Sequence, residues 1–151
     1  MRTVQEESFE EGLNELQVLL PIHWEDLALN KDKVPLDPIY DIYIDRERKG
    51  ELIYVTVRED GDLIGYFIGF IAPGLHYKTC LTCTMDIFYI HPDHRKNGAG
   101  GMLFEFVEKK LKARGVQRWY CGSKNHKSTE WFFEKIGFKP IETYFSKWLG
   151  E

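Results

Sequence analysis

A glycine-rich loop placed between a strand-like run and an amphipathic helix is the feature that most constrains the fold. The loop, IHPDHRKNGAGG, spans residues 90–101, and the helix that follows, residues 98–114, repeats apolar side chains every three or four positions. Each glycine costs roughly 1 kcal/mol of helix propensity relative to alanine. Glycines also leave the first N–H groups of a helix uncovered at the positive end of its dipole. The loop therefore predicts a phosphate or pyrophosphate site, with an ordinary turn as the alternative. It matches neither a dinucleotide fingerprint nor a Walker loop.

The apolar period changes along the chain from helical to strand-like. Asp60-Gly61 between two strand-like runs is a strong hairpin signal, and Gly115 is the expected residue after the long helix. The predicted order is helix 6–20 ended by Pro21, short helices 23–30 and 40–50, strands 51–60, 63–73 and 79–92, helix 98–114, strand 116–122, helix 126–138 broken at Gly137, and strand 139–149. This order predicts an α/β (α+β) fold, a mixed sheet flanked by helices.

Composition narrows the class of protein. The chain has 151 residues, 43% of them hydrophobic, which is enough for one core, so we predict a single domain over residues 1–151. No run approaches the roughly 18 to 20 apolar residues that span a bilayer, and the acidic N-terminal segment does not look like a signal peptide. We therefore expect a cytoplasmic protein without a membrane partner. The net charge of −4 argues against a broad nucleic-acid surface.

The three cysteines do not indicate a metal or redox site. Cys80 and Cys83 have the spacing of a zinc knuckle, but no second pair accompanies them. They also fall in a predicted strand, which places residues three apart on opposite faces. We expect no metal.

Two segments carry a resemblance to a known family. YIHPDHRKNGAGGMLFEFVEKKLKARG resembles the acyl-CoA-binding motif of the GNAT N-acetyltransferase superfamily, Gln/Arg-x-x-Gly-x-Gly/Ala, with Arg95, Gly98 and Gly100 at its specified positions. FFEKIGF resembles the family's second landmark, Tyr-Glu-Lys-x-Gly-Phe. The order of elements also agrees, so the resemblance covers nearly the whole chain. It implies a mostly antiparallel sheet of about six to seven strands, in which the fourth and fifth strands splay apart and admit acetyl-CoA.

The resemblance also implies which residues hold the cofactor. Backbone amides of the loop would bind the pyrophosphate, and the main chain at the end of the fourth strand would pair with the pantetheine arm and offer an N–H near the thioester carbonyl. The residues so assigned are Phe88, Ile90, Arg95, Lys96, Asn97, Gly98, Ala99, Gly100, Gly101, Asn125 and Phe133. Ordinary core positions are the alternative for the two strand residues. Strict spacing of the family's asparagine lands on His126, one residue from Asn125.

Acceptor-side chemistry rests on fewer signals. Asp86 is a carboxylate in an otherwise apolar strand, where burial would raise its pKa and suit it as a general base, although a salt-bridged aspartate is equally compatible. The resemblance places the loop with His76 and Tyr77 beside the acceptor pocket, so His76 is a second catalytic candidate and Tyr77 a substrate contact, with simple packing as the alternative. Trp24 and Glu25 could wall the same pocket, unless they only begin a helix.

One departure from the family concerns the proton donor. The tyrosine that commonly protonates the CoA thiolate would fall at position 133, where this chain has Phe133. Phenylalanine keeps the packing but cannot donate a proton. Tyr144 or Tyr120 could replace it, or the thiolate could leave without a dedicated acid.

The leading hypothesis is an acetyl-CoA-dependent N-acetyltransferase that acts on an amine of a small molecule or a protein by direct attack on the thioester. A protein that binds acyl-CoA without catalysis is one alternative. A nucleobase- or tRNA-modifying acyltransferase is another, which the acidic composition disfavours. The sequence does not identify the acceptor, and it leaves the oligomeric state open, a homodimer included.

Overall fold

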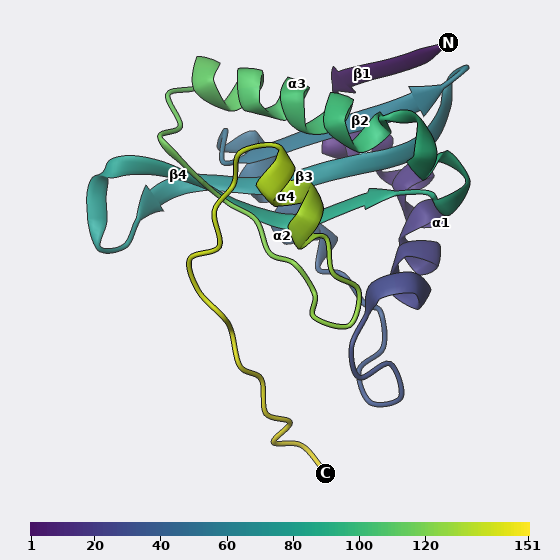
Figure 1. Ribbon diagram of the computed structural model, residues 1–151, viewed down its shortest axis with the longest axis vertical. Coiled ribbons are helices and arrows are strands. Elements are labelled where there is room, and N and C mark those ends of the chain that lie inside the picture. Colours follow the sequence, from purple (N-terminus) through teal and green to yellow (C-terminus); the bar gives the residue numbers. More distant parts are fainter.

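A five-stranded sheet in the order β1-β2-β3-β4-β5 organises the protein, whose computed structural model describes residues 1–151 (Figure 1). The first four strands pair antiparallel, and the fifth runs parallel to the fourth. The strands are β1 Arg2–Glu6, β2 Leu52–Glu59, β3 Asp62–Gly74, β4 Tyr77–Ile90 and β5 Arg118–Tyr120. The helices are α1 Phe9–Leu27, α2 Tyr40–Arg48, α3 Ala99–Ala113 and α4 Glu130–Lys135, with a 3-10 helix, η1, over Pro92–Asn97. The predicted fold class is confirmed, with five strands in place of six to seven.

Two hydrophobic cores cover the two faces of the sheet. On one face α3 and α4 pack against β2–β4, for example through Phe104 and Phe67, whose rings meet edge to face. On the other face α1 and α2 pack against Tyr54 and Tyr66. Successive residues of a strand point to opposite faces, so the central strands contribute to both cores and are apolar almost throughout. None of the helices combines the length and hydropathy that crossing a bilayer requires.

Local turn signals are confirmed by the backbone. Asp60 and Gly61 both adopt positive φ, 50° and 91°, and so form the tight turn between β2 and β3. Gly115 and Gly137 have φ of 81° and 103° just after α3 and α4, where a left-handed residue ends a helix. These three turns were predicted because each depends on residues adjacent in the sequence.

One strand was missed, and two predicted elements differ from the structure. The strand β1 was not predicted, and the helix expected to end at Pro21 continues to Leu27, so the separate helix predicted over residues 23–30 is largely the last part of α1. Pro21 is tolerated because the carbonyl it leaves without a partner belongs to Gln17, on the exposed side of α1. Residues 139–151 form no strand; they are exposed and lead away from the sheet in Figure 1.

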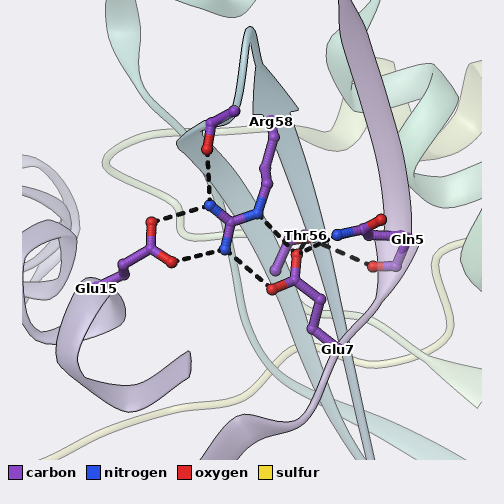
Figure 2. Close-up of polar contacts among 6 residues, drawn as sticks. Gln5, Glu7, Glu15, Thr56 and Arg58 are labelled. Carbon is purple, nitrogen blue, oxygen red and sulfur yellow. Dashed lines mark hydrogen bonds and ion pairs between the residues drawn. The ribbon is translucent and has the colours of Figure 1, made fainter. Parts of the chain in front are cut away.

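An arginine clamp joins β1, β2 and α1 (Figure 2). The guanidinium of Arg58 donates to the carboxylate of Glu7 at 2.9 Å and to that of Glu15 at 2.8 Å, and Nη1 also donates to the carbonyl of Gly61. These bonds from Arg58 are the main reason that the pKa of Glu7 falls to about 2. The clamp fixes the start of α1 relative to the sheet.

Candidate functional site

The fourth and fifth strands separate halfway along β4. They pair only over Thr82–Thr84 and Arg118–Tyr120, so the rest of β4, from Met85 onward, has a free edge on that side. At this point β4 also contains a bulge: Gly69 pairs with Met85 and Ile68 with Ile87, which leaves Asp86 between them without a partner. Separated strands and a bulge at the same position are the basis of the candidate site.

The main chain after the bulge faces the free edge at alternate residues. The N–H of His91 donates to Ile64 of β3 at 2.7 Å, so the peptide groups two and four residues earlier also face β3. Those of Phe88 and Ile90 therefore point to the free edge, as the resemblance implied. Their side chains lie in the α3-side core, where Phe88 contacts Phe104 with ring centroids 4.7 Å apart. Their packing in the core is compatible with the predicted cofactor role, because a strand-like ligand would use only their main chain.

The glycine loop presents uncovered amides at the end of this edge. Gly98 has φ of 75° and follows η1 directly. The N–H of Met102 donates to the carbonyl of Gly98, which is the first hydrogen bond of α3. The amides of Ala99, Gly100 and Gly101 therefore come before the first hydrogen bond within the helix; Ala99 itself is fully buried, so only Gly100 and Gly101 are open to a ligand. A Cβ added at Gly98 or Gly101 would meet no atom within 4 Å, whereas one at Gly100 would lie 3.3 Å from Phe132. Gly100 thus allows close packing with α4, and the other two glycines leave open space.

The charge around the loop suits an anion. The first turn of α3 contains no acidic residue, and the last turn of η1 carries His94 and Lys96. Lys96 and Asn97 are exposed, and the carbonyl of Asn97 accepts from Arg2 at 2.7 Å. Open amides, a basic rim and the adjoining free edge of β4 together fit a pyrophosphate followed by an extended arm, which is the shape of an acyl-CoA.

The Arg95 side chain is directed elsewhere. Its guanidinium donates to the carbonyl of Ile90 at 2.7 Å and to the carboxylate of Asp26 at 2.6 Å, and it lies over the ring of Tyr89. Asp26 also accepts from Lys127 at 2.6 Å. The side chain of Arg95 thus ties the end of α1 to β4 and does not add charge to the loop.

Asp86 lies on the α1–α2 face beside a tyrosine that sequence reasoning missed. The hydroxyl of Tyr43 in α2 donates to the Asp86 carboxylate at 2.5 Å. Desolvation by the surrounding protein raises the pKa of Asp86 even though the residue is exposed to solvent, and the bond from Tyr43 opposes this rise. Burial, followed by the bond to Asp86, raises the pKa of Tyr43, which therefore stays protonated as a donor. A carboxylate with a raised pKa is a stronger base than an ordinary aspartate.

A cavity of about 390 Å³ lies next to this pair. Ile87 of β4, Ile68 of β3 and Tyr43 of α2 line it, and Lys124 lines it from the loop after β5. The remaining walls come from α1, the α1–α2 loop and Tyr40 of α2. They include Trp24, Leu27, Val34, Leu36 and Tyr40. We call this cavity the α1–α2 pocket. Trp24, which was predicted to wall a pocket, is one of its lining residues.

A buried histidine forms part of the pocket lining. His23 in α1 contacts the hydroxyl of Tyr66 through Nδ1 at 2.5 Å and stacks on Tyr89 with ring centroids 4.5 Å apart. Burial lowers the pKa of His23 to about 4, so the ring is neutral at pH 7. Sequence reasoning missed this residue too, although its position four residues after Leu19 continues the apolar stripe of α1.

The other acceptor-side candidates lie apart from Asp86. His76 is exposed at the tip of the β3–β4 hairpin, ten residues before Asp86, or roughly 30 Å along an extended strand. Tyr77 lines a different cavity near Arg118, and Glu25 is an exposed residue beside Lys31. The structure therefore does not bring His76, Tyr77 or Glu25 into one site with Asp86.

Of the positions considered for proton donation to the CoA thiolate, one is buried, one is on the exposed tail and one is in β5. Phe133 is buried and packs against Phe138, Phe104 and Phe88, which confirms the packing expected without a hydroxyl. Tyr144 is 87% exposed on the tail, so nothing holds it near Asp86. Tyr120 pairs with Thr84, two residues before Asp86, and accepts a hydrogen bond from Arg118 at 3.2 Å. Tyr120 is therefore the better placed of the two tyrosines.

Asn125 lies at the tip of an exposed turn after β5. The turn is closed by a bridge between Lys124 and Lys127, and His126 contacts the carbonyl of Leu27 at 2.9 Å. The turn therefore reaches the end of α1 and borders the α1–α2 pocket.

Comparison with known proteins agrees with this geometry. Residues 2–138 match the family model described as the acetyltransferase (GNAT) family. The chain belongs to this family. It is accordingly an acetyltransferase, which argues against the non-catalytic binding protein. No curated protein matches the chain in sequence.

Solved structures of GNAT proteins share the fold along the full chain. A ribosomal-protein-alanine N-acetyltransferase from Brucella melitensis has a TM-score of 0.78 at 17% identity, covering 100% of this chain and 99% of that chain. A predicted acetyltransferase from Clostridium acetobutylicum, solved with acetyl-CoA, has a TM-score of 0.72 at 16% identity, and the match covers 99% of this chain and 97% of that chain. Glucosamine-6-phosphate N-acetyltransferase from Arabidopsis thaliana has a TM-score of 0.73 at 13% identity, covering 99% of each chain. At these identities the likeness establishes the fold and leaves the acceptor open.

Proposed function

We propose that this GNAT protein transfers an acetyl group from acetyl-CoA to a primary amine by direct attack on the thioester, and that residues 1–151 act as one domain. The observation that carries the proposal is the bulge in β4. It places the Asp86 carboxylate on one face of the sheet at the position where the free edge of the strand begins. A donor laid along that edge and an amine held beside Asp86 would meet there.

Acetyl-CoA would supply the activated acetyl group as a thioester. The amides of Gly100 and Gly101 would bind its pyrophosphate, with Lys96 at the rim, and the main chain of Phe88 and Ile90 would bind the arm. Ala99, which is fully buried, would support this turn without touching the ligand. The carbonyl of Ile90 already accepts a bond from Arg95, so that bond must open or be shared when the arm pairs with this residue.

The reaction requires two proton transfers that this chain must arrange. The amine nitrogen forms a bond to the acetyl carbon, the carbon–sulfur bond breaks, one proton leaves the nitrogen and one reaches the sulfur. Asp86 would take the first proton, helped by its raised pKa, while Tyr43 holds its carboxylate in place. Phe133 cannot supply the second, and Tyr120 at the separation of the strands is the residue that we assign to it.

Replacing Asp86 by asparagine tests the proposal. Asp86→Asn keeps the size of the side chain and removes the base, so we expect kcat for a reactive amine to fall about 10²- to 10⁴-fold, the usual contribution of a general base. The affinity for acetyl-CoA, measured by calorimetry, should stay within twofold.

Asp62→Asn is the matched control, because Asp62 is exposed beside the β2–β3 turn. It should retain the parent rate and the parent affinity. Full activity in Asp86→Asn would refute the assigned base. Absence of acetyl-CoA binding in the parent would refute the cofactor.

A further inference from the structure

We propose that the acceptor is a small primary amine with an aromatic or branched aliphatic body, and that this body binds in the α1–α2 pocket. The inference rests on the proposed function and names the substrate class that the same site selects. Its basis is the position of the pocket, the chemistry of its walls and the scarcity of charge within it.

The pocket reaches the proposed base through two of its lining residues, although Asp86 is not itself part of the lining. Tyr43 lines the pocket and donates its hydroxyl hydrogen bond to Asp86, and Ile87, the next residue after Asp86, lines it from β4. An amine nitrogen placed at the Asp86 carboxylate would therefore have the rest of its molecule in this cavity.

A second cavity, of about 300 Å³, is the competing location. It lies beside the part of β4 that still pairs with β5 and is lined by Thr82, Thr84, Arg46 and Arg118. Two guanidinium groups would favour an anionic acceptor. This cavity borders the paired part of β4, whereas the α1–α2 pocket borders its free edge. The free edge is where the thioester would lie, so we assign the acceptor to the α1–α2 pocket.

The walls of the α1–α2 pocket are mostly apolar. Trp24, Tyr40 and Tyr43 provide aromatic surface, and Leu27, Val34 and Leu36 provide aliphatic surface. Its volume of about 390 Å³ falls within the range of small-molecule sites. A phenyl or branched alkyl group that leaves water for such a cavity typically gains about 10- to 100-fold in affinity.

Charged side chains in the lining are few and balanced. Asp37 and Lys124 carry one charge of each sign, and His23 is neutral and already contacts Tyr66. A polycationic acceptor would need a cluster of carboxylates, and a phosphorylated sugar would need a cluster of cations. Neither cluster is present in this lining, so the pocket selects by apolar contact.

The test compares amines of similar size and different polarity. Acetyl-CoA consumption would be followed with 2-phenylethylamine and isoamylamine, against ethanolamine, 4-aminobutyrate and glucosamine. We expect kcat/KM for the two apolar amines to exceed that for the polar ones by at least 10-fold. Binding of 2-phenylethylamine would also be measured by calorimetry in the absence of acetyl-CoA.

Two aspartate substitutions localise the effect. Val34→Asp introduces a carboxylate into the pocket wall at a residue that is already 44% exposed, and Leu29→Asp introduces one at a residue that is 55% exposed and outside the lining. Val34→Asp should lower kcat/KM for 2-phenylethylamine at least 10-fold, with acetyl-CoA affinity unchanged. Leu29→Asp should behave as the parent.

The outcomes separate this inference from the proposed function. Faster turnover of ethanolamine, 4-aminobutyrate or glucosamine overturns the inference and leaves the transferase function intact. Binding of 2-phenylethylamine that Val34→Asp abolishes, with no turnover of any amine, supports the pocket assignment and counts against the proposed function. A parent that neither binds nor acetylates the apolar amines overturns the inference.

Discussion

Neutralising Glu7 should remove a large part of the protein's stability at neutral pH. Glu7 receives two hydrogen bonds from Arg58, one from Thr56 and one from Gln5, and only 18% of its side chain is exposed. These bonds stabilise the ionised carboxylate, so its pKa is lowered from 4.5 to about 2 in the folded protein. The unfolded chain has no such partners and keeps the ordinary value.

The magnitude follows from linkage between protonation and folding. A pKa that is lower in the folded state contributes stability above the unfolded value, and this contribution disappears as the pH falls through the folded value. The difference between 4.5 and about 2 corresponds to at most roughly 3 kcal/mol. Partial exposure reduces this figure, so we expect about 1 to 3 kcal/mol from Glu7 at pH 7, lost between about pH 5 and pH 2.

Urea unfolding at pH 7, 5, 4 and 3 measures this directly. Glu7→Gln should lower the free energy of unfolding at pH 7 by about 1 to 3 kcal/mol, and its stability should decline less steeply than that of the parent below pH 5. Glu25→Gln, at a carboxylate of α1 that is 69% exposed, is the control and should leave both unchanged. Parallel curves for the parent and Glu7→Gln below pH 5 would refute the reasoning.

Two further predictions concern the cofactor loop and the base. Gly101→Glu should weaken acetyl-CoA binding at least 10-fold in calorimetry, because it places a carboxylate in the open space beside the amides. Position 101 avoids the strain that positive φ would impose on a substitution at Gly98. Gly101→Ala is the control, and equal weakening by both substitutions would contradict the electrostatic cause. Tyr43→Phe removes a bond that lowers the pKa of Asp86, so the acid limb of the pH profile of kcat/KM should move to higher pH. A limb that stays in place would exclude Asp86 as the base.

The sequence predicted those elements whose signals are local. The Asp60-Gly61 turn, the helix α3 and the glycine after it each depend on neighbouring residues. The strand β1 was missed because Arg2–Glu6 is mostly polar, and its strand conformation depends on pairing with β2 some fifty residues later. Residues 139–151 have apolar side chains that suggested a strand, but no strand of the sheet pairs with them.

In the candidate site, too, residues with a local sequence signal could be identified and residues brought together by tertiary packing could not. The glycine loop could be singled out because its residues are contiguous and carry the family motif, and its role in binding the cofactor stays a prediction. Tyr43 and His23 were missed because each belongs to a helix that reaches Asp86 or Tyr66 only through tertiary packing, 43 residues away in both cases. His76 and Tyr144 were chosen from assumed proximity, but the long β3–β4 hairpin and the unpaired tail carry them away from the site.

One signal for the bulge was present in the sequence. Cys83, Met85, Phe88 and Ile90 all pack in the α3-side core, so the apolar spacing changes from two to three between Met85 and Phe88. A spacing of three within a strand requires an extra residue, and the bulge supplies it at Asp86. Without the bulge, Phe88 and Ile90 would turn toward the α1–α2 face and Tyr89 would leave it. The single extra residue therefore lets a carboxylate enter the acceptor side while the apolar residues after it stay buried, and it occurs where β5 leaves β4. The bulge and the free edge thus coincide at one point of the strand, and the bulge explains why an acidic residue is compatible with an otherwise apolar sequence at this position.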